Sequence, residues 1–420
     1  MIIAPRHGNM KNMMLFCATA LLLAGSAACQ PGIIQEKDNP YKALSLTTKQ
    51  AAFVETGNTF AFNLLNSVEA ESAKDYVISP LSLQFLLGMI LDGAKGATAD
   101  EICKVLGYGE GETTAVNEYC LSMLGQLPAL DRQTKLKIAN AIYVDDGWPL
   151  LDSYKKDVKK YYDAAIDNLD FSKTKESARI INKWCSDHTE GLIDHILDET
   201  SPDMLAYLLN ALYFKSQWAD KFDKGMSADE DFTCADGSKV KTRMMKAYRD
   251  MMYQGSKTYE AVCLPYGNGA FSMTVLRPKD GFLVSDVTKE LAASEWNDVR
   301  YGFGNREVDL WLPKFETKFS IKLNKILSDL GMPLAFDPIA DLSAMSDYAL
   351  CLSYVNQDAY IKVDEEGTEA AAISSAAVMK NTSVGIPEPP VVFHADKPFL
   401  YIITEKSTGA ILFAGRYSGK

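Results

Sequence analysis

Histidine is scarce in this chain, with four histidines among 420 residues. His7 lies in an N-terminal extension and His394 near the C-terminus, which leaves His188 and His195 as the bases that a catalytic site would need. These two stand on a predicted helix among aspartates, an arrangement that would also suit a metal ion. No Gly-x-Ser-x-Gly nucleophile elbow occurs in the sequence. Ser-His-Asp catalysis is therefore disfavoured, and we expect that the protein is not an enzyme.

Basic clusters are also missing. The net charge of −12 and the pI near 5.0 argue against a nucleic-acid partner. The nearest exception is the segment 154–161, where two pairs of lysines lie between Tyr154 and Tyr161. On a helix its apolar side chains recur every three or four residues as a buried stripe, which leaves the lysines in solvent. The stripe consists of Leu151, Tyr154, Val158, Tyr161 and Tyr162.

The eight cysteines form no CxxC pair and no metal-ligand spacing. A chain of this length needs no disulfides, so we expect free, mostly buried thiols in the main body of the protein. These are Cys103, Cys120, Cys185, Cys234, Cys263 and Cys351. The stretch Gly93–Thr98 has the letters of a phosphate loop in the wrong order. It predicts a helix-to-helix turn with Thr98 as a cap, and we expect no cofactor.

The N-terminal apolar run, Met13–Ala24, is shorter than the roughly 20 residues that span a bilayer. It follows Lys11 and precedes small residues, which is the pattern of an export signal. We therefore predict residues 1–28 as a signal peptide, of which 1–9 are an over-extended start.

Cys29 stands directly after the small residues, as in bacterial lipoprotein signals. We expect residues 29–46 to form a tether with Cys29 lipidated, and several acyl chains would hold it stably in a membrane. Ordinary cleavage after Ala27 or Ala28 stays open, because Ser26 replaces a larger aliphatic residue. The protein is thus expected at a bacterial cell envelope or surface, or alternatively secreted. Residues 47–420 contain no linker or repeat and are predicted to form a single domain.

The segment 365–378 carries the strongest functional signal. Read as a strand, its alternate residues are small or β-branched and uncharged, whereas Glu369 points to the other face. The alternate residues are Thr368, Ala370, Ala372, Ser374, Ala376 and Val378. Gly367 and the proline-rich stretch 387–390 suit an exposed connection instead. A segment that suits both settings indicates a loop that inserts into a sheet.

This segment resembles the hinge and reactive loop of the serpins, the serine protease inhibitor family. Other stretches resemble serpin motifs in the same order along the chain. They are 77–83, 209–218, 310–315, 340–343 and 393–403. The resemblance implies an α+β serpin fold, with three β-sheets, surrounding α-helices and an exposed reactive-centre loop over residues 364–392. It also places His188 and His195 on a surface helix and its following turn, so no metal site is expected.

The resemblance implies an irreversible suicide-substrate inhibitor of serine endopeptidases, with cysteine endopeptidases as a further option. The expected partner is a target protease held in a covalent 1:1 complex with a monomeric inhibitor. A heparin-type cofactor is not expected, because residues 112–130 contain no Lys or Arg. The alternative is a non-inhibitory binding protein on the serpin fold. Small hinge residues favour inhibition, since non-inhibitory members often carry bulky, charged or proline residues there.

The resemblance also implies site residues. The hinge comprises Glu365, Glu366, Gly367, Thr368, Glu369, Ala370, Ala371 and Ala372. A polar cluster that gates the sheet comprises Ser79, Ser82, Asn210 and Gln357, the last of which replaces a usual histidine. The scissile bond falls about fourteen residues after the hinge glycine, where the candidates are Met379, Lys380, Asn381 and Thr382. Counting back from Pro398 gives a later bond, near Val384.

Overall fold

The computed structural model describes residues 39–368 and 388–419. Within these residues no helix is long and apolar enough to cross a membrane. The helices are α1 (Thr48–Glu71), α2 (Pro80–Gly93), α3 (Gly96–Leu106), α4 (Thr113–Gln126), α5 (Asp152–Tyr162), α6 (Thr174–His188), α7 (Val284–Ala292), α8 (Trp296–Tyr301) and α9 (Asn324–Leu330), with short 3-10 turns η1 (Leu127–Ala129) and η2 (Pro333–Phe336).

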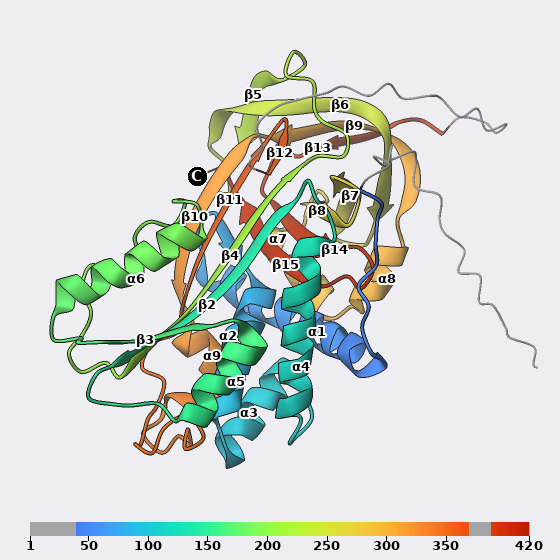
Figure 1. Ribbon diagram of the computed structural model, residues 1–420. Helices are drawn as coiled ribbons and strands as arrows, with labels where there is room; N and C mark the ends of the chain where they lie inside the picture. The colour runs from blue at the N-terminus through green and yellow to red at the C-terminus, as the bar shows by residue number, and fades with distance from the viewer. Residues whose placement is uncertain (1–38, 369–387, 420) are drawn as a thin grey trace, which may run out of the picture. The chain divides into compact units, whose positions relative to one another are not determined.

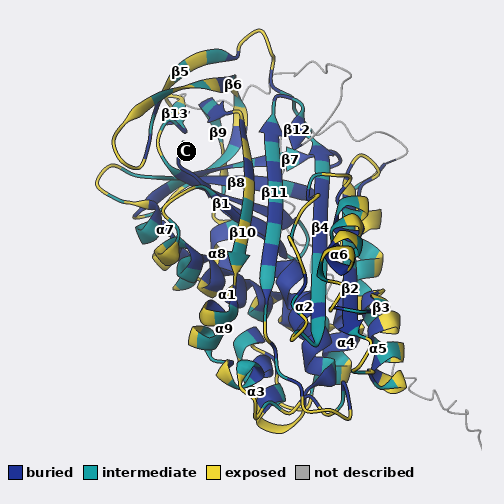
Figure 2. Ribbon diagram, turned by 90° about the vertical axis from the view of Figure 1, so that its left-hand side faces the viewer, coloured by how far each residue is buried: buried dark blue, intermediate teal, exposed yellow. Residues whose placement is uncertain are grey.

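The strands of the first sheet follow the order β10-β11-β12-β4-β2-β3. Their bounds are β2 (Lys135–Asp145), β3 (Ala165–Leu169), β4 (Ala206–Gln217), β10 (Phe315–Lys322), β11 (Asn356–Asp364) and β12 (Gly367–Thr368). Figure 2 shows β11 and β4 running side by side, with β12 between them at one end only. We call this the main sheet.

A second ladder runs β1-β15-β14-β8-β7-β6-β9-β13, with β5 paired to β6. Its strands are β1 (Tyr76–Ile78), β5 (Ala228–Thr233), β6 (Lys239–Gly255), β7 (Tyr259–Tyr266), β8 (Phe271–Pro278), β9 (Gly304–Pro313), β13 (Val391–His394), β14 (Phe399–Glu405) and β15 (Ile411–Tyr417). The long strand β6 joins two groups, because residues 244–253 pair with β9 and residues 252–255 pair with β7. The α+β, three-sheet prediction is confirmed, with two of the sheets continuous through β6.

Helix α2 is the central helix, and all its residues except Asp92 are buried. A helix that is apolar all round has to lie inside the core. It begins at Ser79, whose side chain accepts from Ser82 N, and Pro80 follows at the first helical position, where its missing N–H costs nothing. The helix packs against β4 and β15, so it holds the main sheet to the second ladder.

Helix α6 covers the opposite face of the main sheet (Figure 1). Its apolar side chains form a separate cluster with residues from β2 and β4. The two faces of β4 therefore have different neighbours, since alternate residues point to opposite sides. Leu212 and Phe214 belong to the large core, whereas Tyr207 and Ala211 lie under α6.

Several sequence predictions of local structure are confirmed. Helix α5 buries Tyr154, Val158 and Tyr162. The six cysteines within the described residues are free, four of them buried and two partly buried. The turn after Gly93 joins α2 to α3, but the prediction of Thr98 as its cap is wrong. Thr98 lies inside α3, where its hydroxyl accepts from Asp341 N at 3.0 Å.

Candidate functional site

Strand β12 places the first part of the hinge segment between two long strands of the main sheet. Thr368 pairs with Val363 of β11 on one side and with Ser216 of β4 on the other. Gly367 pairs in the same way with Asp364 and Gln217. Both pairings are antiparallel, so the chain leaves β11, turns at residues 365–366 and enters the sheet as a new strand.

Gly367 permits this entry. Its φ of +153° lies in a region that side chains with a Cβ rarely adopt. A Cβ at this position would stand 2.1 Å from Ser216 O and 2.6 Å from Gln217 Cα. The backbone of β12 can therefore approach β4 only with glycine here.

The turn before β12 is held by two carboxylates. Buried Glu365 accepts from Ser227 Oγ at 3.0 Å and from Lys314 Nζ at 3.1 Å. Burial opposes its ionisation, but hydrogen bonds from its own backbone and from these two side chains outweigh burial and lower its pKa. Glu366 accepts from Lys221 and Lys224, each at 2.8 Å, and these hydrogen bonds lower its pKa as well. Both residues of the turn are thus held in place by ion pairs with lysines.

Thr368 faces the large core. It is buried, and its hydroxyl lies 2.6 Å from the Tyr266 hydroxyl. The Tyr266 ring stacks on Trp218, with centroids 4.4 Å apart, and Trp218 N in turn donates to Glu366 O at 2.9 Å. Burial raises the pKa of Tyr266 far above its usual value, so this hydroxyl keeps its proton.

Beyond Thr368, no ladder among the described residues joins the inner edges of β11 and β4. Strand β11 pairs with β10 from Asn356 to Val363, and β4 pairs with β2 from Ala206 to Lys215. Among the described residues the only strand paired to both β11 and β4 is the two-residue β12. Two facing strand edges that no described ladder joins form a template for one more strand. We call this region the strand gap.

The structure brings three of the four predicted gating residues together at the strand gap. Gln357 uses its amide twice: its oxygen accepts from Ser79 N at 3.0 Å, and its nitrogen donates to Ser79 O at 2.8 Å. The Ser79 hydroxyl donates to Leu412 O at 2.8 Å, and it accepts from Ser82 N at 3.3 Å. β11, α2 and β15 are therefore tied through one serine.

Asn210 does not join this cluster. Its amide nitrogen donates to Asn140 Oδ1 at 2.6 Å, and Asn140 donates to Tyr162 O at 2.7 Å. The Asn210 side-chain oxygen is buried and accepts no hydrogen bond from the described residues. Such an oxygen costs free energy while unpaired, which favours any state that supplies a donor. Sequence reasoning missed Asn140, although an asparagine within an otherwise apolar strand is a visible signal.

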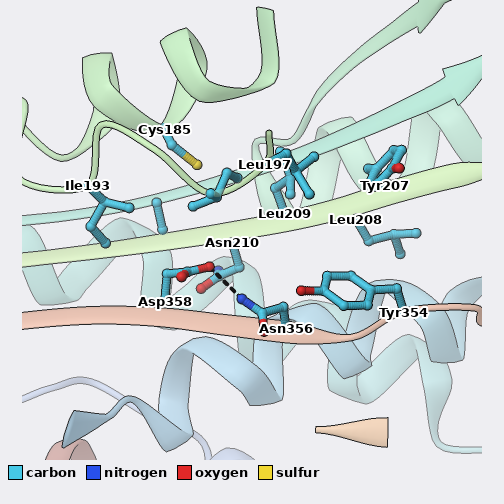
Figure 3. A pocket seen from close by; sticks show the side chains of 12 residues that line it. Cys185, Ile193, Leu197, Tyr207, Leu208, Leu209, Asn210, Tyr354, Asn356 and Asp358 are labelled. Carbon is cyan, nitrogen blue, oxygen red and sulfur yellow. Dashed lines mark hydrogen bonds between the residues drawn. The ribbon is translucent and has the colours of Figure 1, made fainter. Parts of the chain in front are cut away.

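A pocket opens into the strand gap near Asn210 (Figure 3). Its walls are apolar residues from the α6 side, including Ile193 and Leu197, and polar residues from β11. Asn356 donates to Asp358 at 2.7 Å along the β11 edge. Burial raises the pKa of Asp358. The pocket therefore lies where residues of β4 and β11 face each other.

Other predicted site residues lie outside the described residues. They are Cys29, the hinge residues Glu369, Ala370, Ala371 and Ala372, and the candidate scissile residues Met379, Lys380, Asn381 and Thr382. At its two ends, the predicted loop over 364–392 overlaps regular strands. Asp364 is the last residue of β11, and Val391 and Val392 begin β13.

His188 ends α6 and His195 lies in the segment that follows, as the resemblance implied, so the expectation that both stand on one helix is wrong. Helix α6 ends at His188, and residues 190–191 with positive φ turn the chain away. His188 contacts Trp184 O at 2.7 Å through Nδ1, and exposed His195 lies 3.0 Å from Asp198. Within residues 39–368 and 388–419 no group of three or more His, Cys, Asp or Glu side chains could hold a metal ion.

Comparison with known proteins gives a consistent result. The family model described as Serpin (serine protease inhibitor) matches residues 55–419. Serpin B6 of Macaca fascicularis is 32% identical over 375 residues, which span 87% of this chain and 98% of that protein. The crystal structure of the thermophilic serpin Tengpin in the native state is 28% identical with a TM-score of 0.80, covering 91% of this chain and 97% of that chain. Thyroxine-binding globulin in complex with thyroxine is 25% identical with a TM-score of 0.76, covering 87% and 98%.

Proposed function

Since the chain belongs to the serpin family, we propose that it is an irreversible suicide-substrate inhibitor of serine endopeptidases. Serpins are generally inhibitors rather than catalysts, and the family supports a protease-directed function of this kind. The observation that carries the proposal is the strand gap, a position in the main sheet between β11 and β4 at which, among the described residues, only the two of β12 pair with both strands. Cysteine endopeptidases are a second target class, because they too form an acyl-enzyme.

The register of β12 indicates how further residues would fit. If both ladders continued, Ala370 would stand between Phe214 and Ile361, and Ala372 between Leu212 and Ala359. These four neighbours belong to the large core, so the entering side chains have to be small. The alternation read from the sequence has this same parity, with Thr368 on the core face.

Two further positions support insertion. At the same register, Ser374 would stand between Gln357 and Asn210, where its hydroxyl could donate to the unpaired Asn210 oxygen. Glu369 would stand between Lys215 and Lys362 on the opposite face, so its charge would meet two cations. The loop sequence thus matches the gap in size, polarity and charge.

Insertion would stop the protease after its first chemical step. The protease cleaves the exposed loop and remains attached as an acyl-enzyme, which frees one end of the loop. About fourteen residues at roughly 3.3 Å each would then carry the protease some 45 Å along the sheet. Catalytic geometry tolerates little displacement, so deacylation fails and the complex persists.

The test is complex formation with trypsin, elastase and a papain-like enzyme. We expect a covalent 1:1 species that survives SDS with at least one of them. Mass spectrometry of the released C-terminal fragment then identifies the bond, with Lys380-Asn381 expected for trypsin and a bond nearer Val384 as the alternative. Cleavage without any persistent complex would contradict the inhibitory function.

A non-inhibitory binding protein is the second candidate, and the similarity to thyroxine-binding globulin favours it. That structure shows that this fold also occurs in a ligand complex. The two candidates differ in one observable. A carrier would be cleaved in its loop without trapping the protease, whereas an inhibitor would trap it.

We also propose export with a lipid anchor on Cys29, for which the sequence pattern is the support. The full-length chain expressed in a bacterium is expected to incorporate labelled palmitate and to fractionate with membranes. A Cys29→Ser variant should lose both properties. Unchanged membrane fractionation of that variant would contradict lipidation.

A further inference from the structure

The segment between α6 and β4 crosses the strand gap on the face of the main sheet that α6 covers. Near its start, Glu190 pairs with Lys137 of β2 at 3.0 Å. A few residues later, Asp194 pairs with Lys318 of β10 at 3.3 Å. Strands β2 and β10 flank β4 and β11 in the sheet order, so the chain passes over both inner strands between these two ion pairs. We call residues 190–197 the crossing segment.

The crossing segment forms an apolar wall above the strand gap. Its residues Ile193, Ile196 and Leu197 line the pocket near Asn210, and Figure 3 shows Ile193 and Leu197 on the side of α6. Helix α6 holds this wall through Asn182, whose side-chain oxygen accepts from Leu197 N at 3.0 Å and whose nitrogen donates to Leu197 O at 2.7 Å. The wall is therefore in place whether or not a strand lies between β11 and β4.

The floor of the pocket has room beside a small residue of β4. Alternate residues of a strand share a face, and those of β4 that point toward α6 are Tyr207, Leu209, Ala211 and Tyr213. Ala211 is the smallest of the four. It lines the pocket from one side of the strand gap, and Asp358 of β11 lines it from the other. A side chain that entered between Ala211 and Asp358 would therefore meet the apolar wall.

The register of β12 identifies the occupant of the pocket. If both ladders continued beyond Thr368, Ile373 would stand between Ala211 and Asp358 on the face toward α6. Among residues 367–377, Ile373 is the only one with a large apolar side chain. The one bulky aliphatic group in this part of the loop would thus lie at the apolar pocket.

The same position also distinguishes one register from its neighbours. A strand shifted by two residues keeps its faces, but it would bring Ala371 or Ser375 to the place beside Ala211. The pocket would then hold a much smaller side chain and lose apolar contacts. Filling of the pocket therefore favours the register in which Ile373 lies beside Ala211.

We propose that the pocket receives the side chain of Ile373, and that Ile373 is an anchor residue that fixes the register of the inserted strand beneath the crossing segment. Contact with Ile193, Ile196 and Leu197 removes its aliphatic surface from water and stabilises the inserted state. This inference rests on the proposed function, because it assumes that the loop enters the main sheet.

A double-mutant cycle in the cleaved chain provides the test. Wild type, Ile373→Ala, Ile196→Ala and the double variant would each be cleaved near Lys380, and calorimetry would give Tm before and after cleavage. The rise in Tm should be about 4 °C smaller for Ile373→Ala than for wild type, because the truncated side chain leaves the pocket partly empty. Ile196→Ala should lose a similar part of the rise. The double variant should lose little more than either single variant, since the two side chains contact each other.

Three comparisons control for truncation alone. Ile373→Val keeps most of the side chain and should show nearly the wild-type rise. Ile339→Ala removes the same atoms at a position that is 75% exposed, and it should show the full rise. Before cleavage, Ile373→Ala should melt with wild type, because the anchor acts only in the inserted state.

The outcomes separate the anchor from the proposed function. A full rise in Tm for cleaved Ile373→Ala, or losses that simply add in the double variant, would overturn the anchor even though the rise of wild type still supported insertion. If cleaved wild type itself showed no rise, insertion would be contradicted, and the proposed function would fail together with the anchor.

Discussion

Gly367 sets whether the hinge can enter the sheet at all. A Gly367→Ala variant would force a Cβ to within 2.1 Å of Ser216 O at a φ of +153°. We expect β12 to leave its position and the free energy of unfolding to fall by about 1–3 kcal/mol. Gly237→Ala is the matched control, because Gly237 also has positive φ, at +81°, but open space around it. Thermal unfolding of both variants separates the close contact from backbone strain, and equal losses would contradict the role of the contact.

Glu366 gives the turn a pH dependence with a defined sign. Its folded pKa is lowered by hydrogen bonds from Lys221 and Lys224. A carboxylate with a lowered folded pKa stabilises the protein above its unfolded pKa of about 4.3, and this stabilisation is lost as the pH falls through the folded value. We therefore expect Glu366→Gln to be less stable than wild type by about 1 kcal/mol at pH 7. The difference should vanish toward pH 2–3 in denaturant titrations, and a constant difference across this range would contradict the ion pairs.

If β12 continued into the main sheet, the new strand would have two faces, and neighbouring hinge positions would distinguish them. At the register of β12, Ala370 would face the core between Phe214 and Ile361, whereas Ala371 would face the α6 side. We expect Ala370→Arg to abolish the SDS-stable complex and turn the inhibitor into a substrate, because a buried unpaired charge slows entry until water completes the reaction. Ala371→Arg should keep most of the trapping activity. Stoichiometry of inhibition measures both, and equal losses would contradict the register.

At the scale of strands and helices, the sequence pattern predicts which face of an element is buried, but it does not predict the distant residues that the element contacts. Alternation of small residues predicted the face of Thr368, and the three- and four-residue spacing of apolar side chains predicted the buried stripe of α5. The partners of these elements could not be predicted from such patterns. Lys314, Ser227 and Tyr266 reach the hinge from strands or turns far away in sequence. Asn210 was expected beside Gln357, yet it pairs with Asn140 across the β2–β4 ladder, because the nearest strand supplies the first partner.

At the scale of the whole molecule, the fold could be predicted from the resemblance to the serpins, but not from the periodicity of apolar residues alone. The main sheet joins strands from residues 135 to 368, so its order depends on contacts that no local window contains. The strand pairing also shows which edges of the main sheet lack a full partner strand among the described residues. Strands β11 and β4 each have one satisfied edge, and only β12 bridges them within the described residues. A ladder position that the described residues fill only at Gly367 and Thr368 offers a more stable arrangement, provided that the chain can supply the rest of the strand.

Cleavage of the loop should release that stability. Severing the bond near Lys380 with a protease, followed by removal of the protease, frees residues 369–380 to continue β12. New ladder hydrogen bonds contribute about 0.5–1.5 kcal/mol each, with further apolar burial against Leu212 and Phe214. A net gain of about 5 kcal/mol would raise Tm on the order of 10 °C, measured by calorimetry of the cleaved and intact chains. The Ala370→Arg variant, cleaved at the same bond, should show a much smaller rise, because its side chain cannot enter the core. If cleaved wild type melted with the intact chain, the strand gap would not be a site of insertion, and the inhibitory mechanism would lose its driving force.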